Sequence, residues 1–146
     1  MKKCFWITSY PKSGNTWLRL IMCGLFFSDS GKIKNFEVLK KIPKIDTLKN
    51  FEFIKDISME DYKIIFSDKT FDEKMFLTYF KYSTEAQKNI NLNGGTFGFF
   101  KTHSSNYNHK NLKYANLNKT RGCIYLVRDP RDIAISYSKF LKESYD

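Results

Sequence analysis

A short segment rich in hydrogen-bond donors, residues 10–17, is suited to binding an anion. It reads Tyr-Pro-Lys-Ser-Gly-Asn-Thr-Trp. Lys12 brings a positive charge, and Gly14 permits unusual backbone angles and close approach of a ligand. Side-chain hydroxyl and amide groups are supplied by Ser13, Asn15 and Thr16. The segment lies between an apolar strand and an apolar helix, so the unpaired N–H groups and positive dipole end of a helix start would face the ligand.

Two more groups suited to this chemistry follow apolar runs later in the chain. His103 comes directly after an aromatic run, and Arg128 directly after an aliphatic one. If both runs are strands of a parallel sheet, the two side chains lie at its carboxyl edge, where open α/β folds bind ligands. The alternative for His103 is a histidine satisfied by local hydrogen bonds. The alternative for Arg128 is a surface ion pair with Asp129 or Asp132.

Three motifs together resemble the sulfotransferases that use 3′-phosphoadenosine 5′-phosphosulfate (PAPS). Residues 10–17 lack the Walker A pattern of nucleotide kinases, because the lysine precedes the only glycine. They closely resemble the 5′-phosphosulfate loop of that family, Y-P-K-S-G-T-T-W, and differ from it only at Asn15. The string Y-L-V-R-D-P-R-D-I-A-I-S-Y is similar to the family's 3′-phosphate element, in which an arginine and a serine eight residues later hold the phosphate. Arg128 and Ser136 have this spacing, and a K-T-H segment ends at His103.

The resemblance implies transfer of a sulfuryl group from PAPS to a hydroxyl or amine of an acceptor. It implies that His103 is the catalytic base, that Lys12 stabilises the leaving oxygen and that Lys101 steadies the sulfonate. The residues expected to bind the nucleotide are Lys12, Ser13, Gly14, Asn15, Thr16, Trp17, Arg128 and Ser136. Trp17 would stack on the adenine, although packing alone would also explain an indole there. No metal is expected, because lysine, arginine and a helix start already provide positive charge.

Two other functions account for parts of the sequence. A module that binds PAPS or adenosine 3′,5′-bisphosphate (PAP), but has lost its chemistry, would keep all three motifs. A basic nucleic-acid binder would explain the net charge of +10 but none of the motifs. The lysines also lack the arginine clustering of a groove-reading module. We therefore expect a small-molecule, lipid or carbohydrate acceptor and no nucleic acid; the sequence does not identify the acceptor.

The elements that would position these residues form an α/β fold. Strands are predicted from Cys4 to Ile7, over 96–100 and over 123–127, each buried on both faces of a parallel sheet. Helices are predicted over 18–26, 59–67 and 71–82, with a further helical turn or two over 85–90. The last helix begins at Pro130 with Asp129 as its N-cap. It is expected to bury Ile133, Tyr137, Phe140 and Leu141. The resemblance refines this fold to a P-loop-like three-layer α/β/α arrangement with a central parallel sheet.

The length of 146 residues predicts one domain. The cysteines, Cys4, Cys23 and Cys123, are interpreted as buried hydrophobic residues in a reducing compartment. With no signal-peptide core and no run long enough to span a membrane, the prediction is a cytoplasmic protein. A metal site at His103 and His109 is not expected, because no carboxylate or cysteine companions stand at ligand spacing.

Sulfotransferases of this kind usually continue well beyond the 3′-phosphate element, into a glycine-rich and basic segment that closes over the nucleotide. We therefore expect residues 1–146 to be a single sulfotransferase domain in truncated or minimal form. An open site and an exposed apolar sheet would follow, with low activity and self-association.

Overall fold

The computed structural model describes residues 3–44, 54, 56–65, 73–89, 96–104, 108–109 and 111–141. The chain divides into two compact units. The sheet unit consists of Phe5–Pro43, Phe99–Ser104 and Gly122–Asp146. The helical unit consists of Met1–Cys4, Lys44–Gly98 and Ser105–Arg121.

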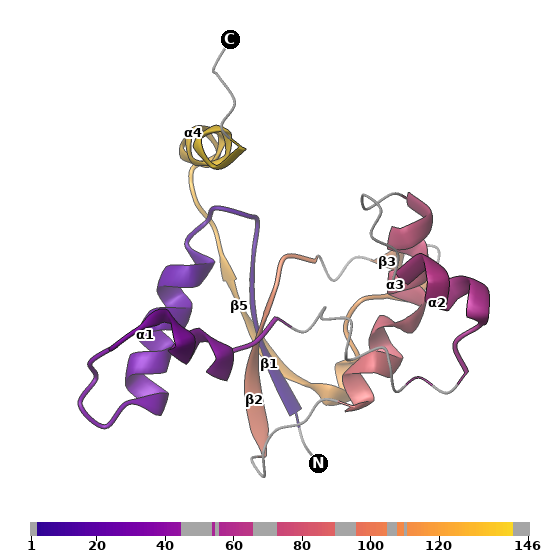
Figure 1. Cartoon of the computed structure of the whole chain (residues 1–146), viewed down its shortest axis with the longest axis horizontal. Coiled ribbons are helices and arrows are strands. Elements are labelled where there is room, and N and C mark those ends of the chain that lie inside the picture. The colour runs from indigo at the N-terminus through magenta and orange to yellow at the C-terminus, as the bar shows by residue number, and fades with distance from the viewer. Residues whose placement is uncertain are drawn as a thin grey trace. The chain divides into compact units, whose positions relative to one another are not determined.

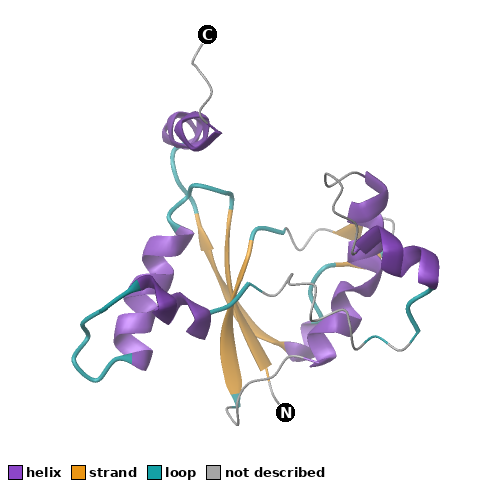
Figure 2. Cartoon of the chain, in the orientation of Figure 1, coloured by secondary structure: helices purple, strands orange, loops and turns teal. Residues whose placement is uncertain are grey.

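A parallel three-stranded sheet confirms the α/β prediction (Figures 1 and 2). Its strands are β1 (Lys3–Ser9), β2 (Phe97–Thr102) and β5 (Thr120–Leu126), in the order β2-β1-β5. The first strand in sequence is therefore central and the two later strands flank it. Since the strands are parallel, the turns that follow their carboxyl ends meet at one edge of the sheet.

One face of the sheet packs against helix α1 (Asn15–Phe27) and the 3₁₀ helix η1 (Phe36–Lys41). The core between them is formed by Ile7, Met22, Cys23 and Ile42, with partly buried Leu18, Val38, Phe99 and Leu126. Arg19 crosses from α1 and donates from Nη2 to the carbonyl oxygens of Leu39 (2.8 Å) and Ile42 (2.6 Å). These carbonyls lie at the end of η1, so Arg19 caps the 3₁₀ helix and fixes it to α1.

Aromatic pairs set the register between β1 and β2. Phe5 packs on Phe99 with ring centroids 5.5 Å apart, and Trp6 packs on Phe100 at 6.3 Å. Successive residues of a strand point to opposite faces, so the two pairs lie on opposite faces of the sheet. This pairing brings the ends of both strands, at Ser9 and Thr102, to the same level.

Helix α4 (Pro130–Leu141) begins as predicted, because Asp129 Oδ1 accepts a 2.9 Å hydrogen bond from the backbone N–H of Arg131. The Arg131 side chain also binds this carboxylate, and both hydrogen bonds lower the Asp129 pKa. The predicted burial of the α4 stripe is wrong. No described residue of α4 is buried, and Phe140 is 67% exposed. Its ring instead lies over the Lys12 ammonium group.

The predicted burial of the third strand is also wrong. β5 has no buried residue among those described, and Tyr125 is 63% exposed. Cys4 and Cys23 are buried as predicted, whereas Cys123 is exposed. The reason is the position of β5 at the edge of the sheet, where no described element covers the face that Cys123 and Tyr125 share.

The helical unit contains helices α2 (Met59–Ile65) and α3 (Glu73–Ala86) and the 3₁₀ turns η3 (Gln87–Asn89) and η4 (Leu117–Lys119). Short strands β3 (Asn108–His109) and β4 (Leu112–Lys113) pair antiparallel. Its core consists of Ile54, Ile65, Tyr82 and Ala86. The turn predicted over 85–90 is the end of α3 continued by η3. Residues 66–67, 71–72 and 90 of the predicted helices lie outside the described residues.

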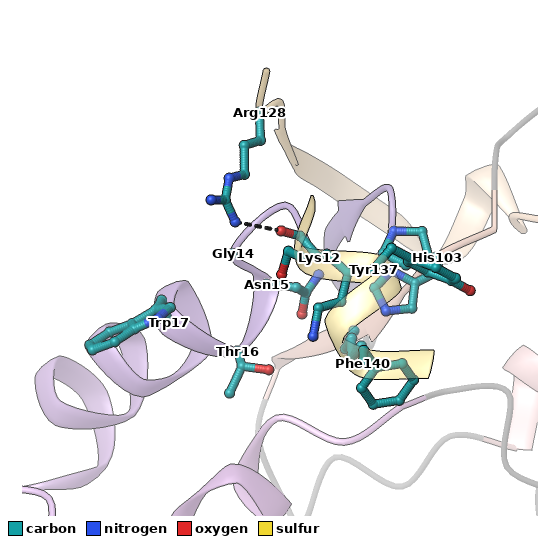
Figure 3. Close-up of a pocket in the computed structure, with 12 residues that line it drawn as sticks. Lys12, Gly14, Asn15, Thr16, Trp17, His103, Arg128, Tyr137 and Phe140 are labelled. Carbon is teal, nitrogen blue, oxygen red and sulfur yellow. Dashed lines mark hydrogen bonds between the residues drawn. The ribbon is translucent and has the colours of Figure 1, made fainter. Parts of the chain in front are cut away.

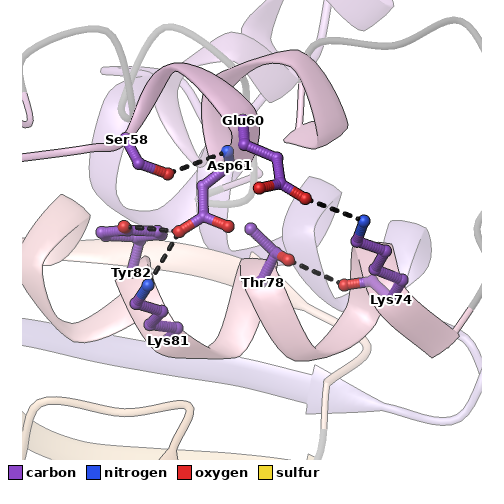
Figure 4. Close-up of polar contacts among 7 residues, drawn as sticks. All are labelled: Ser58, Glu60, Asp61, Lys74, Thr78, Lys81 and Tyr82. Atoms are coloured by element: carbon purple, nitrogen blue, oxygen red, sulfur yellow. Dashed lines mark hydrogen bonds and ion pairs between the residues drawn. The ribbon is translucent and has the colours of Figure 1, made fainter.

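Asp61 joins α2 to α3 (Figure 4). Its Oδ2 accepts 2.7 Å hydrogen bonds from Lys81 Nζ and Tyr82 Oη, and its backbone N–H donates to Ser58 Oγ at 3.0 Å. Hydrogen bonds from Lys81 and Tyr82 lower the pKa of Asp61. Beside this contact, Lys74 Nζ lies 3.1 Å from Glu60 Oε1. The carboxylate of Asp61 therefore holds the two helices together.

Candidate active site

The turn between β1 and α1 leaves a helix start open to a ligand. It is closed by a hydrogen bond from the Ser13 N–H to the Tyr10 carbonyl oxygen (3.3 Å), and two residues adopt left-handed backbone angles, Lys12 (φ 67°) and Gly14 (φ 99°). Gly14 is the N-cap of α1, and no side chain among the described residues caps the helix there. A Cβ atom at Gly14 would meet nothing within 4 Å, so a ligand can approach the backbone closely. The helix start is therefore open to a ligand at Gly14, and the N–H groups of its first turn have no intrahelical acceptors.

A cavity of about 490 Å³ lies over this turn at the carboxyl edge of the sheet (Figure 3). Its walls come from the β1–α1 turn, the end of β2, the segment between β5 and α4, and helix α4. The lining residues are Pro11, Lys12, Gly14, Asn15, Thr16, Trp17, Lys101, His103, Arg128, Ser136, Tyr137 and Phe140. Every residue that the sequence nominated, with the exception of Ser13, is among them. Ser13 is 7% exposed, and its Oγ has no hydrogen-bond partner within the described part of the chain.

The cavity is cationic. Lys12, Lys101 and Arg128 line it, and none of its lining residues is acidic. Arg128 Nη1 donates to the Lys12 carbonyl oxygen at 3.1 Å, which ties the end of β5 to the turn. Arg128 Nε also lies 3.6 Å from Asp132 Oδ2, so the ion pair considered from the sequence exists beside the cavity contact. This charge distribution favours an anionic ligand.

His103 is fixed by the backbone of β1. Its Nδ1 lies 2.8 Å from the Ser9 carbonyl oxygen. A carbonyl oxygen only accepts hydrogen bonds, so Nδ1 carries the proton and the lone pair of the neutral ring is on Nε2. Lys101, two residues earlier, is held by a 2.9 Å hydrogen bond from its N–H to the Pro43 carbonyl oxygen. The geometry thus gives the cavity an imidazole of defined tautomer.

A comparison with protein families decides the broader class. The model of the sulfotransferase domain matches residues 2–146. The chain belongs to the sulfotransferase family. No curated protein and no solved structure matches it. Sulfotransfer is the reaction of the family, and the cationic cavity with its histidine is the candidate site for it.

Asn15, the one difference from the family's loop motif, turns its side chain toward the sheet. Its Nδ2 donates to the Ile7 carbonyl oxygen and to Ser9 Oγ, both at 3.2 Å. The residue is 5% exposed although it borders the sulfotransferase cavity. The amide group is therefore used inside the protein, and the backbone N–H is the donor at the helix start.

Trp17 has the opposite environment. Its side chain is 73% exposed, so packing does not account for the indole. In Figure 3 it lies apart from the cationic groups, on α1. It borders the sulfotransferase cavity and also a second, apolar cavity of about 580 Å³ along the outer side of α1.

The sequence missed three residues of the sulfotransferase cavity, Pro11, Tyr137 and Phe140. Tyr137 and Phe140 were assigned to a buried stripe because their spacing is that of a core face. The Phe140 ring centroid lies 4.6 Å from Lys12 Nζ, a cation–π contact between α4 and the turn. Only the position of Tyr137 next to Ser136 in the 3′-phosphate motif could have indicated that α4 lines the cavity.

Over the described ranges, no group of three or more His, Cys, Asp or Glu residues is arranged to hold a metal ion. The helices in those ranges are all too short or too polar to cross a membrane.

Proposed function

We propose that this sulfotransferase moves a sulfuryl group from PAPS to a hydroxyl or amine of an acceptor. The observation that carries the proposal is the meeting of three sequence motifs in one cavity. Lys12, His103 and Arg128 are far apart in the chain, yet all line the same 490 Å³ space. Residues 1–146 are proposed to act as one domain, since the family match extends over almost all of them.

The residues present fit the donor. PAPS carries anionic groups at the 5′ and 3′ positions of its ribose, and the cavity has cations in two places. Lys12, the first-turn N–H groups and Thr16 would hold the 5′ end, while Arg128 and Ser136 would hold the 3′-phosphate. A volume of 490 Å³ is within the usual range of roughly 300–1,000 Å³ for ligand pockets. The exposed indole of Trp17 offers a surface for the adenine.

The chain's own groups would supply the rest of the chemistry. When bound, PAPS provides an activated sulfuryl group whose bond to the 5′-phosphate oxygen breaks as the acceptor oxygen or nitrogen bonds to sulfur. His103 would take the acceptor's proton on Nε2, because Nδ1 already carries one. Lys12 and Lys101 would neutralise the negative charge that spreads over the transferring group and the leaving oxygen. Positioning and charge neutralisation would thus provide most of the catalysis.

Partners and location follow from the same proposal. A sugar, lipid, phenol or small alcohol fits it as the acceptor. We also propose that the protein works in the cytoplasm, because its cysteines are free thiols. The exposed apolar side chains of Tyr125 on β5 and of Val127 just after it support self-association.

Ligand binding tests the donor. In thermal-shift measurements, PAP should raise the melting temperature more than AMP does, and a DNA oligomer should have little effect. Stabilisation by DNA with none by PAP would reject the proposal. Transfer of labelled sulfate from PAPS across a panel of acceptors then separates an enzyme from a module that only binds.

Variants of the two histidines test the base. His103→Ala should lower the transfer rate by about 10²–10⁴ and leave PAP binding intact, because a general base contacts the acceptor. His109→Ala is the matched control, since it removes the other histidine of the chain, which no motif assigns to the site. Equal rates for the two variants would remove His103 from the mechanism.

A further inference from the structure

A buried chain of polar groups connects the anion-binding turn to His103. Asn15 Nδ2 lies 3.2 Å from Ser9 Oγ, and Ser9 Oγ lies 3.4 Å from His103 Nδ1. Asn15 is 5% exposed and Ser9 only 2%. The three residues come from the start of α1, the end of β1 and the residue after β2, so the chain crosses the edge of the sheet beneath the cavity.

The acceptors in this chain determine which way each donor points. The carbonyl oxygen of Ile7 accepts from Asn15 at 3.2 Å, which places the NH₂ group and not the oxygen of that amide toward the sheet. One of its two N–H groups binds Ile7 and the other binds Ser9 Oγ. The Nδ1–H of His103 points at the Ser9 carbonyl oxygen, 2.8 Å away, with Ser9 Oγ as a second acceptor. The donors of Asn15 and His103 therefore converge on Ser9, whose hydroxyl and carbonyl oxygens accept them.

We propose that Asn15 and Ser9 are positioning residues that hold His103 with its proton on Nδ1 and its lone pair on Nε2. The proposal rests on the proposed function for its catalytic meaning. Asn15 fixes the Ile7–Ser9 end of β1 by two hydrogen bonds, and this end carries the carbonyl oxygen that selects the tautomer. Without Asn15, the Ser9 carbonyl and hydroxyl can shift, and the imidazole is free to exchange its tautomer.

This arrangement links donor binding to the state of the base. Asn15 is the first residue of α1, so its backbone N–H belongs to the helix start that would hold the 5′-phosphate. The side chain of the same residue reaches Ser9. A displacement of the helix start would then be transmitted to His103 through two hydrogen bonds.

Nitrogen NMR of the histidine rings tests the proposal without any ligand. In protein labelled with ¹⁵N-histidine, the long-range proton–nitrogen pattern shows which ring nitrogen carries the proton. His109→Gln leaves His103 as the single histidine and so assigns its signals. The expected result is a neutral ring protonated at Nδ1 in the wild type, with a growing share of the Nε2-protonated form in Asn15→Ala and a smaller share in Ser9→Ala.

Thr8→Ala is the control, because it deletes a hydroxyl from the same strand on the opposite face, and it should leave the pattern unchanged. A wild-type ring protonated at Nε2, or an unchanged pattern in both Asn15→Ala and Ser9→Ala, would overturn the proposal. The two variants delete groups at different points of the hydrogen-bonded chain. If Asn15→Ala does not fold, the ring pattern of Ser9→Ala therefore decides the test.

Kinetics complete the test. For Asn15→Ala we expect kcat to fall by about tenfold, which corresponds to about 1.4 kcal/mol, with a much smaller change in the affinity for PAP. A loss that appears only in PAP affinity would reject the positioning role. If the wild type does not bind PAP at all, the proposed function fails, while the ring pattern still decides whether Asn15 and Ser9 set the tautomer.

Discussion

Replacement of Arg128 by alanine should reduce the preference for PAP over AMP. Arg128 is assigned to the 3′-phosphate, which PAP has and AMP lacks. The guanidinium group lines the cavity, is held toward the turn by the Lys12 carbonyl oxygen and lies 3.6 Å from Asp132. Removing it therefore deletes a contact that only PAP can make.

The size of the effect follows from these partners. A hydrogen bond to a charged group contributes about 1.5–3 kcal/mol. Arg128 and Asp132 are 42% and 58% exposed, and an exposed ion pair of this kind is worth up to about 0.5 kcal/mol, which would be lost when PAP binds. The net loss is about 1–2.5 kcal/mol, or roughly 5- to 70-fold in affinity. AMP affinity should change little.

Isothermal titration calorimetry with PAP and AMP measures both affinities on each variant. Arg121→Ala is the matched control, because Arg121 is an exposed arginine of β5 outside the cavity and its loss changes the net charge equally. If Arg128→Ala weakens PAP and AMP by the same factor, or no more than Arg121→Ala does, the assignment of Arg128 to the 3′-phosphate is wrong.

Three other substitutions have defined outcomes. Lys12→Ala should weaken PAP binding by about tenfold to a hundredfold, measured by calorimetry, because a charge-assisted contact is lost; unchanged binding would reject the loop assignment. Arg19→Met should lower the free energy of unfolding, measured in urea, by about 2–4 kcal/mol, since two carbonyls at the end of η1 lose their donor. Arg19→Lys should recover part of this stability. An Arg19→Met variant as stable as the wild type would contradict the capping role. Asp61→Asn should destabilise the chain by about 1–2 kcal/mol at neutral pH. The folded-state pKa of Asp61 is lowered, so the stability difference between wild type and Asp61→Asn is fully present above the unfolded pKa of about 3.9 and shrinks as pH falls through the folded pKa. Urea titrations that give the same stability difference at pH 3 and pH 7 would show that ionisation of Asp61 is unimportant.

The lining of the candidate site was predictable because its motifs are local. The turn at 10–17, the histidine after β2 and the arginine after β5 are each defined by a few neighbouring residues. The parallel order of the strands then brings them together at one edge. A short sequence pattern fixes both the residue type and its place at the end of a strand, so little tertiary information was needed.

Burial at the sheet edge was not predictable in the same way. The spacing in α4 and the aliphatic run of β5 resemble core patterns, yet Phe140 and Tyr125 are mostly exposed. Hydrophobic periodicity shows which side of an element is apolar and does not show whether another element covers it. The inward turn of Asn15 was missed for a related reason, since its acceptors, Ile7 and Ser9, precede it in a different element.

The left-handed backbone of Lys12 bears on how this protein would change under selection. A lysine at φ 67° costs the fold on the order of 1 kcal/mol, which glycine at that position would avoid. Selection for heat resistance alone would then favour Lys12→Gly, whereas selection for sulfate transfer would retain the lysine. Descendants that no longer bind the donor are expected to drift toward glycine here. The identity of residue 12 would thus separate working members of a lineage from those that have kept only the fold.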